Sequence, residues 1–164
     1  MTFKRVFPVL LLLLFMASCG SSRKSIRTEN STKNPSEDVM LRVSETAQTY
    51  VGTKYQYGGT TKQGMDCSGL IYTAFLEENI SFPRTSGDMA RLGKKIPLRQ
   101  VHIGDLLFFK TNKKKRSVNH VGLVVDTTAN EVFFIHSTTS RGVIISSLDQ
   151  NYWKDSFAMA RRVK

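Results

Sequence analysis

Three stretches with different hydrophobic patterns follow one another along the chain. Residues 6–17 are almost wholly apolar, residues 20–35 carry almost no apolar side chain, and the rest alternates apolar and polar positions periodically. Such periodicity is typical of a globular domain, because each helix or strand buries one face. The pattern therefore predicts a leader over residues 1–18, a linker over residues 19–36 and one folded domain over residues 37–164.

The first half of the domain has the three- and four-residue spacing of helices. Apolar positions between residues 39 and 51 predict an amphipathic helix that Ser36 can cap and Gly52 can end. Asp66 can cap a second helix that reaches about residue 79. This helix is apolar on nearly all sides, so we expect it to be buried. A third, shorter helix begins after Thr85 and ends near residue 93.

The second half of the domain changes to the two-residue alternation of strands. Strand-like segments cover residues 106–109, 119–125, 132–137, 143–147 and 157–163. Short connections between these segments favour an antiparallel meander. Helices followed by such a meander predict an α+β fold, in which the helices cover one face of the sheet.

The leader has the composition of a secretory signal peptide. Lys4 and Arg5 precede an apolar run that is shorter than the roughly 20 residues a membrane-spanning helix needs. The run ends in Met16-Ala17-Ser18-Cys19, which resembles a bacterial lipobox. That resemblance implies that Cys19 becomes the acylated N-terminus and anchors the protein to a membrane. The alternative is an ordinary signal peptide that is cut near Ala17.

We expect an exported monomer that is anchored by lipid to the cell envelope. The outer membrane, facing the periplasm, is the expected place, because Gly20 does not resemble the aspartate of an inner-membrane retention signal. The formal charge of +11 falls to +9 when Lys4 and Arg5 leave with the leader. This excess indicates an anionic partner. Lipid headgroups and cell-wall peptide carboxylates are nearer to such a protein than nucleic acid is, so we expect no nucleic-acid partner.

Cys67 is the only free thiol of the mature chain if Cys19 carries lipid. A lone thiol in an exported protein indicates chemistry, and the alternative is a small buried apolar side chain. Cys67 follows Asp66 at the predicted start of a helix. Unpaired backbone N–H groups and the helix dipole favour a thiolate there. The sequence therefore indicates a nucleophile at Cys67.

Two histidines can serve this thiol. His120 and His136 lie in neighbouring predicted strands, and a hairpin would bring both imidazoles to one sheet beside the second helix. His120 is then the candidate base of a thiolate–imidazolium pair, and His136 the group that orients its ring. The alternatives are a core position for His120 and a zinc site of all three residues, which lacks the short ligand spacing of zinc motifs. His102 is predicted to lie at the surface.

Three segments carry a family resemblance. Asp66-Cys67-Ser68-Gly69, Asn119-His120-Val121-Gly122 and Ile135-His136-Ser137 resemble the three sequence blocks of the NlpC family of papain-like cysteine peptidases. Residues 55–59, 83–85 and 104–106 also match in order, and residues 142–147 and 152–153 resemble the murein endopeptidase lipoproteins of that family. The resemblance covers residues 45–163. It implies a papain-like NlpC fold with N-terminal helices packed on a mostly antiparallel central sheet.

The same resemblance implies a role for individual residues. Cys67 would be the nucleophile, His120 the base and His136 the orienting third residue. The Tyr55 hydroxyl would help to stabilise the oxyanion. No metal or cofactor is implied. The substrate-binding candidates are Asp66, Ser68 and Arg84, with helix capping as the alternative for the first two.

The implied function is hydrolysis of amide bonds in peptidoglycan stem peptides or their cross-links during cell-wall remodelling. The D-alanyl–diaminopimelate cross-link is the expected bond, and the γ-D-glutamyl–diaminopimelate bond is the alternative. Two other classes remain open, a wall-binding protein without turnover and an acyltransferase or amidase on the same fold. The intact set of Cys67, His120 and His136 argues against the first of these.

Overall fold

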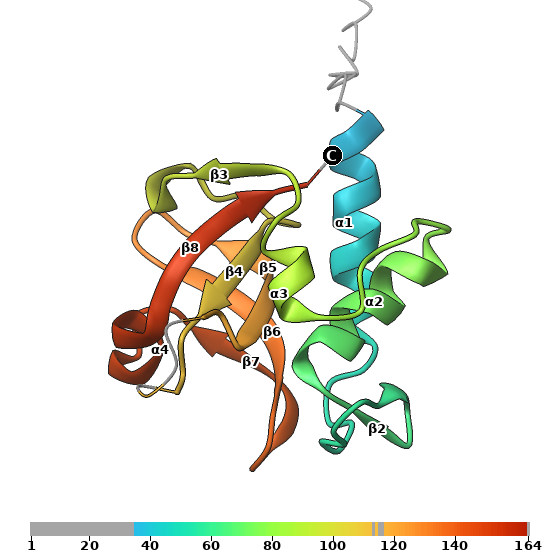
Figure 1. Cartoon of the computed structure of the whole chain (residues 1–164). Helices are drawn as coiled ribbons and strands as arrows, with labels where there is room; N and C mark the ends of the chain where they lie inside the picture. The colour runs from blue at the N-terminus through green and yellow to red at the C-terminus, as the bar shows by residue number, and fades with distance from the viewer. Residues whose placement is uncertain (1–34, 113, 115–116, 164) are drawn as a thin grey trace, which may run out of the picture. The chain divides into compact units, whose positions relative to one another are not determined.

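The computed structural model describes residues 35–112, 114 and 117–163 (Figure 1). The expected leader, Cys19 and most of the expected linker lie outside these residues. The helices are α1 (Pro35–Gln48), α2 (Cys67–Glu77), α3 (Ser86–Met89) and α4 (Asn151–Ser156), and a 3₁₀ turn covers Leu98–Gln100. The strands are β1 (Thr60–Thr61), β2 (Gly64–Met65), β3 (Lys94–Ile96), β4 (Leu106–Phe109), β5 (His120–Thr127), β6 (Val132–Thr138), β7 (Gly142–Ser147) and β8 (Phe157–Arg162). No helix among the described residues has the length and apolar character needed to cross a membrane.

The first three helices form where the sequence predicts them, with different ends. α1 already includes Pro35, so Ser36 lies in its first turn and does not precede it. Asp66 and Thr85 cap α2 and α3 as predicted, each through a side-chain oxygen that accepts a backbone N–H. α3 has only four residues and ends before the predicted position near residue 93.

The main sheet has the order β3-β8-β4-β5-β6-β7, and every neighbouring pair is antiparallel. Strands β4 to β7 form the predicted meander. β8 does not extend the sheet beyond β7; it returns to pair with β4. β3 was not predicted, because its short segment begins with Lys94 and Lys95 and shows no apolar alternation. The α+β prediction is confirmed.

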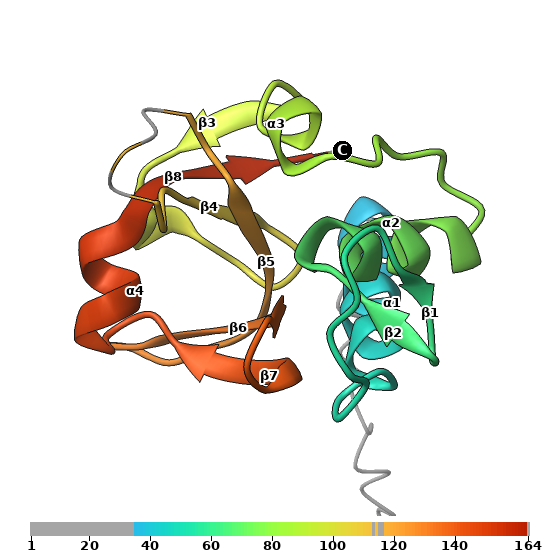
Figure 2. The same cartoon turned by 60° about the horizontal axis from the view of Figure 1, so that its bottom comes forward.

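Both faces of the sheet are buried, whereas the sequence predicted helices on one face only. α1 and α2 pack on the face that carries Phe108, Leu123 and Ile135. α4 lies on the other side of the sheet (Figure 2), and its Trp153 belongs to an apolar cluster on that face. That cluster consists of Val101, Leu107, Phe109, Val124, Phe134, Leu148, Trp153 and Ala160. The six residues of α4 are too few to give a helical period, so the sequence did not predict this second layer.

Gly69 lets the start of α2 approach the loop that precedes it. A Cβ atom at Gly69 would lie 2.0 Å from the carbonyl oxygen of Gly59, a contact that the backbone must move to relieve. We expect Gly69→Ala to lower the free energy of unfolding by about 3 kcal/mol.

Gly87→Ala is the matched control in chemical denaturation. Its Cβ atom would meet only Thr85 Oγ1, at 3.9 Å, and alanine favours helix by about 1 kcal/mol. Equal midpoints for the two variants would contradict the assigned crowding at Gly69.

Candidate active site

The carboxylate of Asp66 fixes the start of α2. Oδ1 accepts from the Gly69 N–H at 2.6 Å, which caps the helix, and Oδ2 accepts from the Gly58 N–H at 2.8 Å. The Ser68 hydroxyl also donates to Oδ1, at 3.1 Å. One carboxylate therefore joins the loop at Gly58–Gly59, the glycine loop, to the first turn of α2. Cys67 is the first residue of that turn.

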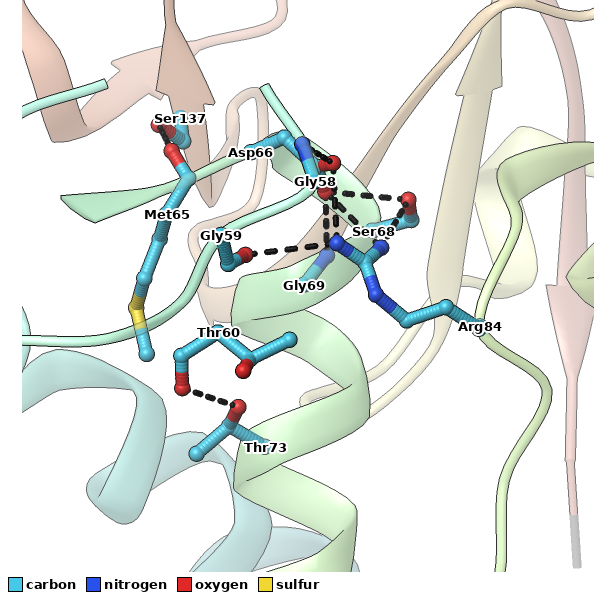
Figure 3. A network of polar contacts seen from close by, with 10 residues as sticks. All are labelled: Gly58, Gly59, Thr60, Met65, Asp66, Ser68, Gly69, Thr73, Arg84 and Ser137. Atoms are coloured by element: carbon cyan, nitrogen blue, oxygen red, sulfur yellow. Dashed lines mark hydrogen bonds and ion pairs between the residues drawn. The ribbon is translucent and has the colours of Figure 1, made fainter. Parts of the chain in front are cut away.

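Arg84 neutralises this carboxylate (Figure 3). Its two terminal nitrogens donate to Asp66 Oδ1 at 3.0 Å and to Oδ2 at 2.9 Å, and they also reach Ser68 Oγ and the Gly59 carbonyl. Burial would raise the pKa of Asp66, but the hydrogen bonds from Arg84, Gly69 and Gly58 lower it below its usual value. The ion pair keeps Asp66 charged, which preserves the hydrogen bonds that it accepts from Gly58, Ser68 and Gly69.

The Cys67 side chain is partly exposed at the first residue of α2. Burial raises the pKa of its thiol, and the Asp66 charge raises it further, while the N–H groups of Val121, Ser68 and Cys67 lower it by hydrogen bonding to the sulfur. The Val121 contact places the sulfur beside the strand residue that follows His120. In the part of the chain that the structure describes, no hydrogen bond joins the thiol to either imidazole.

His120 and His136 contact each other directly. His120 Nε2 lies 3.0 Å from His136 Nδ1, and His136 Nε2 lies 2.9 Å from the hydroxyl oxygen of Ser146. The antiparallel pairing of β5 with β6 brings the two rings together, as the predicted hairpin required. The contact leaves Nδ1 of His120 for a further partner.

Trp153 packs against both imidazoles from α4. Its ring stacks on His120 with 5.3 Å between centroids and meets His136 edge to face at 4.5 Å. Trp153 had no predicted place in the site; only the match of residues 152–153 to a family segment pointed to it. Ser146 was missed in the same way, because a serine within a strand gives no signal of its own.

The buried surroundings hold the imidazoles neutral. Burial lowers the pKa of His120 to about 4. Burial, with repulsion from His120 and Arg141, lowers the pKa of His136 to about 2. With the raised pKa of the Cys67 thiol, these values favour a neutral thiol and a neutral imidazole at neutral pH. The sequence predicted a thiolate–imidazolium pair; the burial of both groups acts against that pair, and the pH dependence of thiol reactivity distinguishes the two states.

The structure places the remaining candidates as follows. Burial raises the pKa of the Tyr55 hydroxyl, and the nearby Cys67 and Asp66 raise it further. Asp66 caps α2, as its alternative holds, whereas the Ser68 hydroxyl and Arg84 donate to the Asp66 carboxylate. His102 is exposed, as predicted. Among the described residues, no group of three or more His, Cys, Asp or Glu side chains is arranged to hold a metal ion.

This fold and this arrangement match a known family. The profile of the NlpC/P60 family matches residues 52–162. The chain belongs to the NlpC/P60 family. The family and fold predicted from the sequence are therefore confirmed.

Named relatives agree with this assignment. The chain is 41% identical over 115 residues to the "Probable endopeptidase NlpC homolog" of Haemophilus influenzae, covering 70% of this chain and 57% of that protein. It is 35% identical over 155 residues to the "Probable endopeptidase NlpC" of Escherichia coli, covering 94% and 97%. It is 34% identical over 150 residues to the E. coli "Murein DD-endopeptidase MepS/Murein LD-carboxypeptidase", covering 88% and 75%.

A solved structure shows the same fold. The crystal structure of an NlpC/P60 family protein from Bacillus cereus superposes with a TM-score of 0.67 at 31% identity. The match covers 75% of this chain and 39% of that one, so this chain corresponds to less than half of the longer protein.

The neutral resting state makes a prediction about thiol reactivity. A raised thiol pKa means less thiolate at any given pH, so alkylation of Cys67 by iodoacetamide should rise with pH through a midpoint above about 8.5, the value of a free cysteine. The measurement uses a Cys19→Ser chain, in which Cys67 is the remaining thiol. The same chain in denaturant gives the reference midpoint. A rate plateau below pH 7 would show an ion pair instead.

Proposed function

We propose that this protein is a lipid-anchored peptidoglycan endopeptidase with Cys67 as nucleophile, His120 as base and His136 as the residue that orients His120. The contact between His120 Nε2 and His136 Nδ1 at 3.0 Å carries the proposal, because it aligns one imidazole and leaves its other nitrogen for a proton. The hydrogen bond from Val121 to the Cys67 sulfur supports it by bringing the thiol to the start of the same strand.

The chemistry is acyl transfer. Cys67 attacks the amide carbonyl of a stem peptide while His120 takes the thiol proton, so the ion pair forms during attack and not before it. His120 then protonates the leaving amine and activates water against the thioester. The Cys67 N–H and the Tyr55 hydroxyl stabilise the oxyanion, where one such donor is worth about 2.7–4 kcal/mol.

Arg84 and Ser68 are proposed to meet the substrate beside the thiol. The Arg84 side chain keeps 33% of its surface exposed although it pairs with Asp66. A guanidinium with a free edge can bind a stem-peptide carboxylate. Asp66 acts in this proposal through Arg84, since its own oxygens are occupied by the cap, the glycine loop and the ion pair.

The D-alanyl–diaminopimelate cross-link is the proposed bond. Similarity to the E. coli protein named murein DD-endopeptidase, over most of both chains, supports this choice. The test is digestion of purified muropeptides with product masses read by mass spectrometry. Loss of dimers with gain of monomers is expected, whereas shortened stems would show cleavage of the γ-D-glutamyl–diaminopimelate bond.

Variants test the assigned residues in the same assay. Cys67→Ala and His120→Ala should each lower turnover by at least about 10³-fold, because nucleophile and base act as one unit. His102→Ala is the control, since that histidine is exposed and should leave turnover unchanged. Undiminished cleavage by Cys67→Ala would contradict the assignment of Cys67 as nucleophile. Absence of cleavage by the unsubstituted protein would contradict the endopeptidase function.

The lipid anchor is proposed at Cys19, with the protein at the outer membrane facing the periplasm. Two or more acyl chains give stable anchoring, as each buried methylene contributes about 0.8 kcal/mol. We expect radioactive palmitate to label the protein and centrifugation to place it in the membrane pellet. Cys19→Ser should lose both properties, and Cys67→Ser should keep both. Labelled Cys19→Ser protein would contradict the anchor site.

A further inference from the structure

Ser146 ends a buried chain of polar contacts that begins at His120. Its hydroxyl oxygen lies 2.9 Å from His136 Nε2, while His136 Nδ1 lies 3.0 Å from His120 Nε2. All three side chains are buried, and the pairing of β6 with β7 holds His136 and Ser146 together. Ser146 thus lies one contact beyond the residues that the proposed mechanism uses.

These contacts can be polarised in two ways while both rings are neutral, because a neutral imidazole has one donor and one acceptor nitrogen. In the first, His120 Nε2 donates to His136 Nδ1, and His136 Nε2 donates to Ser146. His120 Nδ1 is then a bare acceptor. In the second, Ser146 donates to His136, His136 donates to His120, and His120 Nδ1 carries the proton.

Only the first polarity suits a base. His120 Nδ1 must be free of a proton to take one from the Cys67 thiol, and the resulting imidazolium still donates through Nε2. His120 Nε2 donates both before and after His120 takes the proton, so His136 Nδ1 must be an acceptor in both states. His136 must therefore carry its own proton on Nε2, and that proton points at the hydroxyl oxygen of Ser146.

We propose that Ser146 is a positioning residue, whose oxygen accepts the Nε2 proton of His136 and keeps His120 in the tautomer that can accept a proton from Cys67. This inference rests on the proposed function, because it takes His120 as the base. Trp153 supports it by packing on both rings, which holds their nitrogens in line with the hydroxyl.

Two substitutions of equal shape separate hydrogen bonding from packing. Ser146→Thr keeps a hydroxyl and Ser146→Val replaces it with a methyl group. In the valine variant an Nε2 proton on His136 would be buried without an acceptor, which costs about 1–3 kcal/mol. The other tautomer of His136, with its proton on Nδ1, can still donate a hydrogen bond to His120. Ser147→Ala is the control, because the Ser147 hydroxyl donates to Glu131 at 2.6 Å and not to a histidine.

The test reads ring tautomers by long-range ¹H–¹⁵N correlation spectra of the full chain in detergent, labelled with ¹⁵N-histidine. The chain has three histidines, and exposed His102 serves as the internal reference. We expect His120 and His136 to carry their protons on Nε2 in the unsubstituted protein, in Ser146→Thr and in Ser147→Ala. In Ser146→Val we expect both protons on Nδ1.

Turnover of muropeptides should follow the tautomers. Loss of a hydrogen-bond partner of a metal-bound histidine typically changes affinity or activity by about 10- to 100-fold. By analogy, we expect kcat of Ser146→Val to fall by about 10- to 100-fold with KM unchanged, and Ser146→Thr to retain kcat. Unchanged tautomers in Ser146→Val would overturn the inference while leaving the proposed function intact. A proton on His136 Nδ1 in the unsubstituted protein would overturn it even if the valine variant fails to fold. Absence of cleavage by the unsubstituted protein, with tautomers that depend on Ser146, would instead overturn the peptidase function alone.

Discussion

The buried carboxylate of Asp66 is the interaction on which the geometry of the site depends. It caps α2, holds the glycine loop through Gly58 and is neutralised by two hydrogen bonds from Arg84. Breaking such a cluster is costly, because removing one partner leaves a charge that is out of water and unpaired. The position of Cys67 follows from it, since Cys67 is the first residue of α2, directly after the cap. A second hydrogen bond, from the Ser137 hydroxyl to the Met65 carbonyl at 2.7 Å, joins β6 to the residue that precedes Asp66 (Figure 3).

The thiol and the imidazoles belong to opposite sides of the sheet. Cys67 packs with the core under α1 and α2, whereas His120 and His136 lie with Trp153 on the side that α4 covers. His120 is the first residue of β5, so its imidazole lies at one end of that strand. The Val121 N–H, which lowers the pKa of the Cys67 thiol, belongs to the next residue of that strand. A site at a strand end thus joins two separate cores.

Burial sets the protonation states of this site more strongly than the helix dipole does. The dipole and the N–H groups at the start of α2 favour a thiolate, but loss of water around the sulfur raises its pKa. The same loss of water lowers the pKa of both histidines, to about 4 and about 2. Burial therefore shifts the Cys67 thiol and both imidazoles toward their neutral forms. In the proposed mechanism proton transfer accompanies attack. That mechanism requires an unprotonated Nδ1 on His120, and the proposed polarity of the contacts from His120 through His136 to Ser146 provides it.

The sequence by itself determined the features that depend on neighbours along the chain. Periodicity placed α2 and the strands from β4 to β8, and the caps Asp66 and Thr85 were read from residue type, since a cap bonds to an N–H only two or three residues ahead. The sequence also brought His120 and His136 together, because a hairpin between neighbouring strands is a local structure. Only the tertiary structure decided that β8 pairs with β4, that Arg84 neutralises Asp66, and that Trp153 and Ser146 surround the imidazoles. Those contacts join residues that are far apart in the chain, or that lie on strands whose register the sequence pattern does not give. Burial shifts the pKa values of Cys67 and both histidines, and it arises only when the two cores have formed.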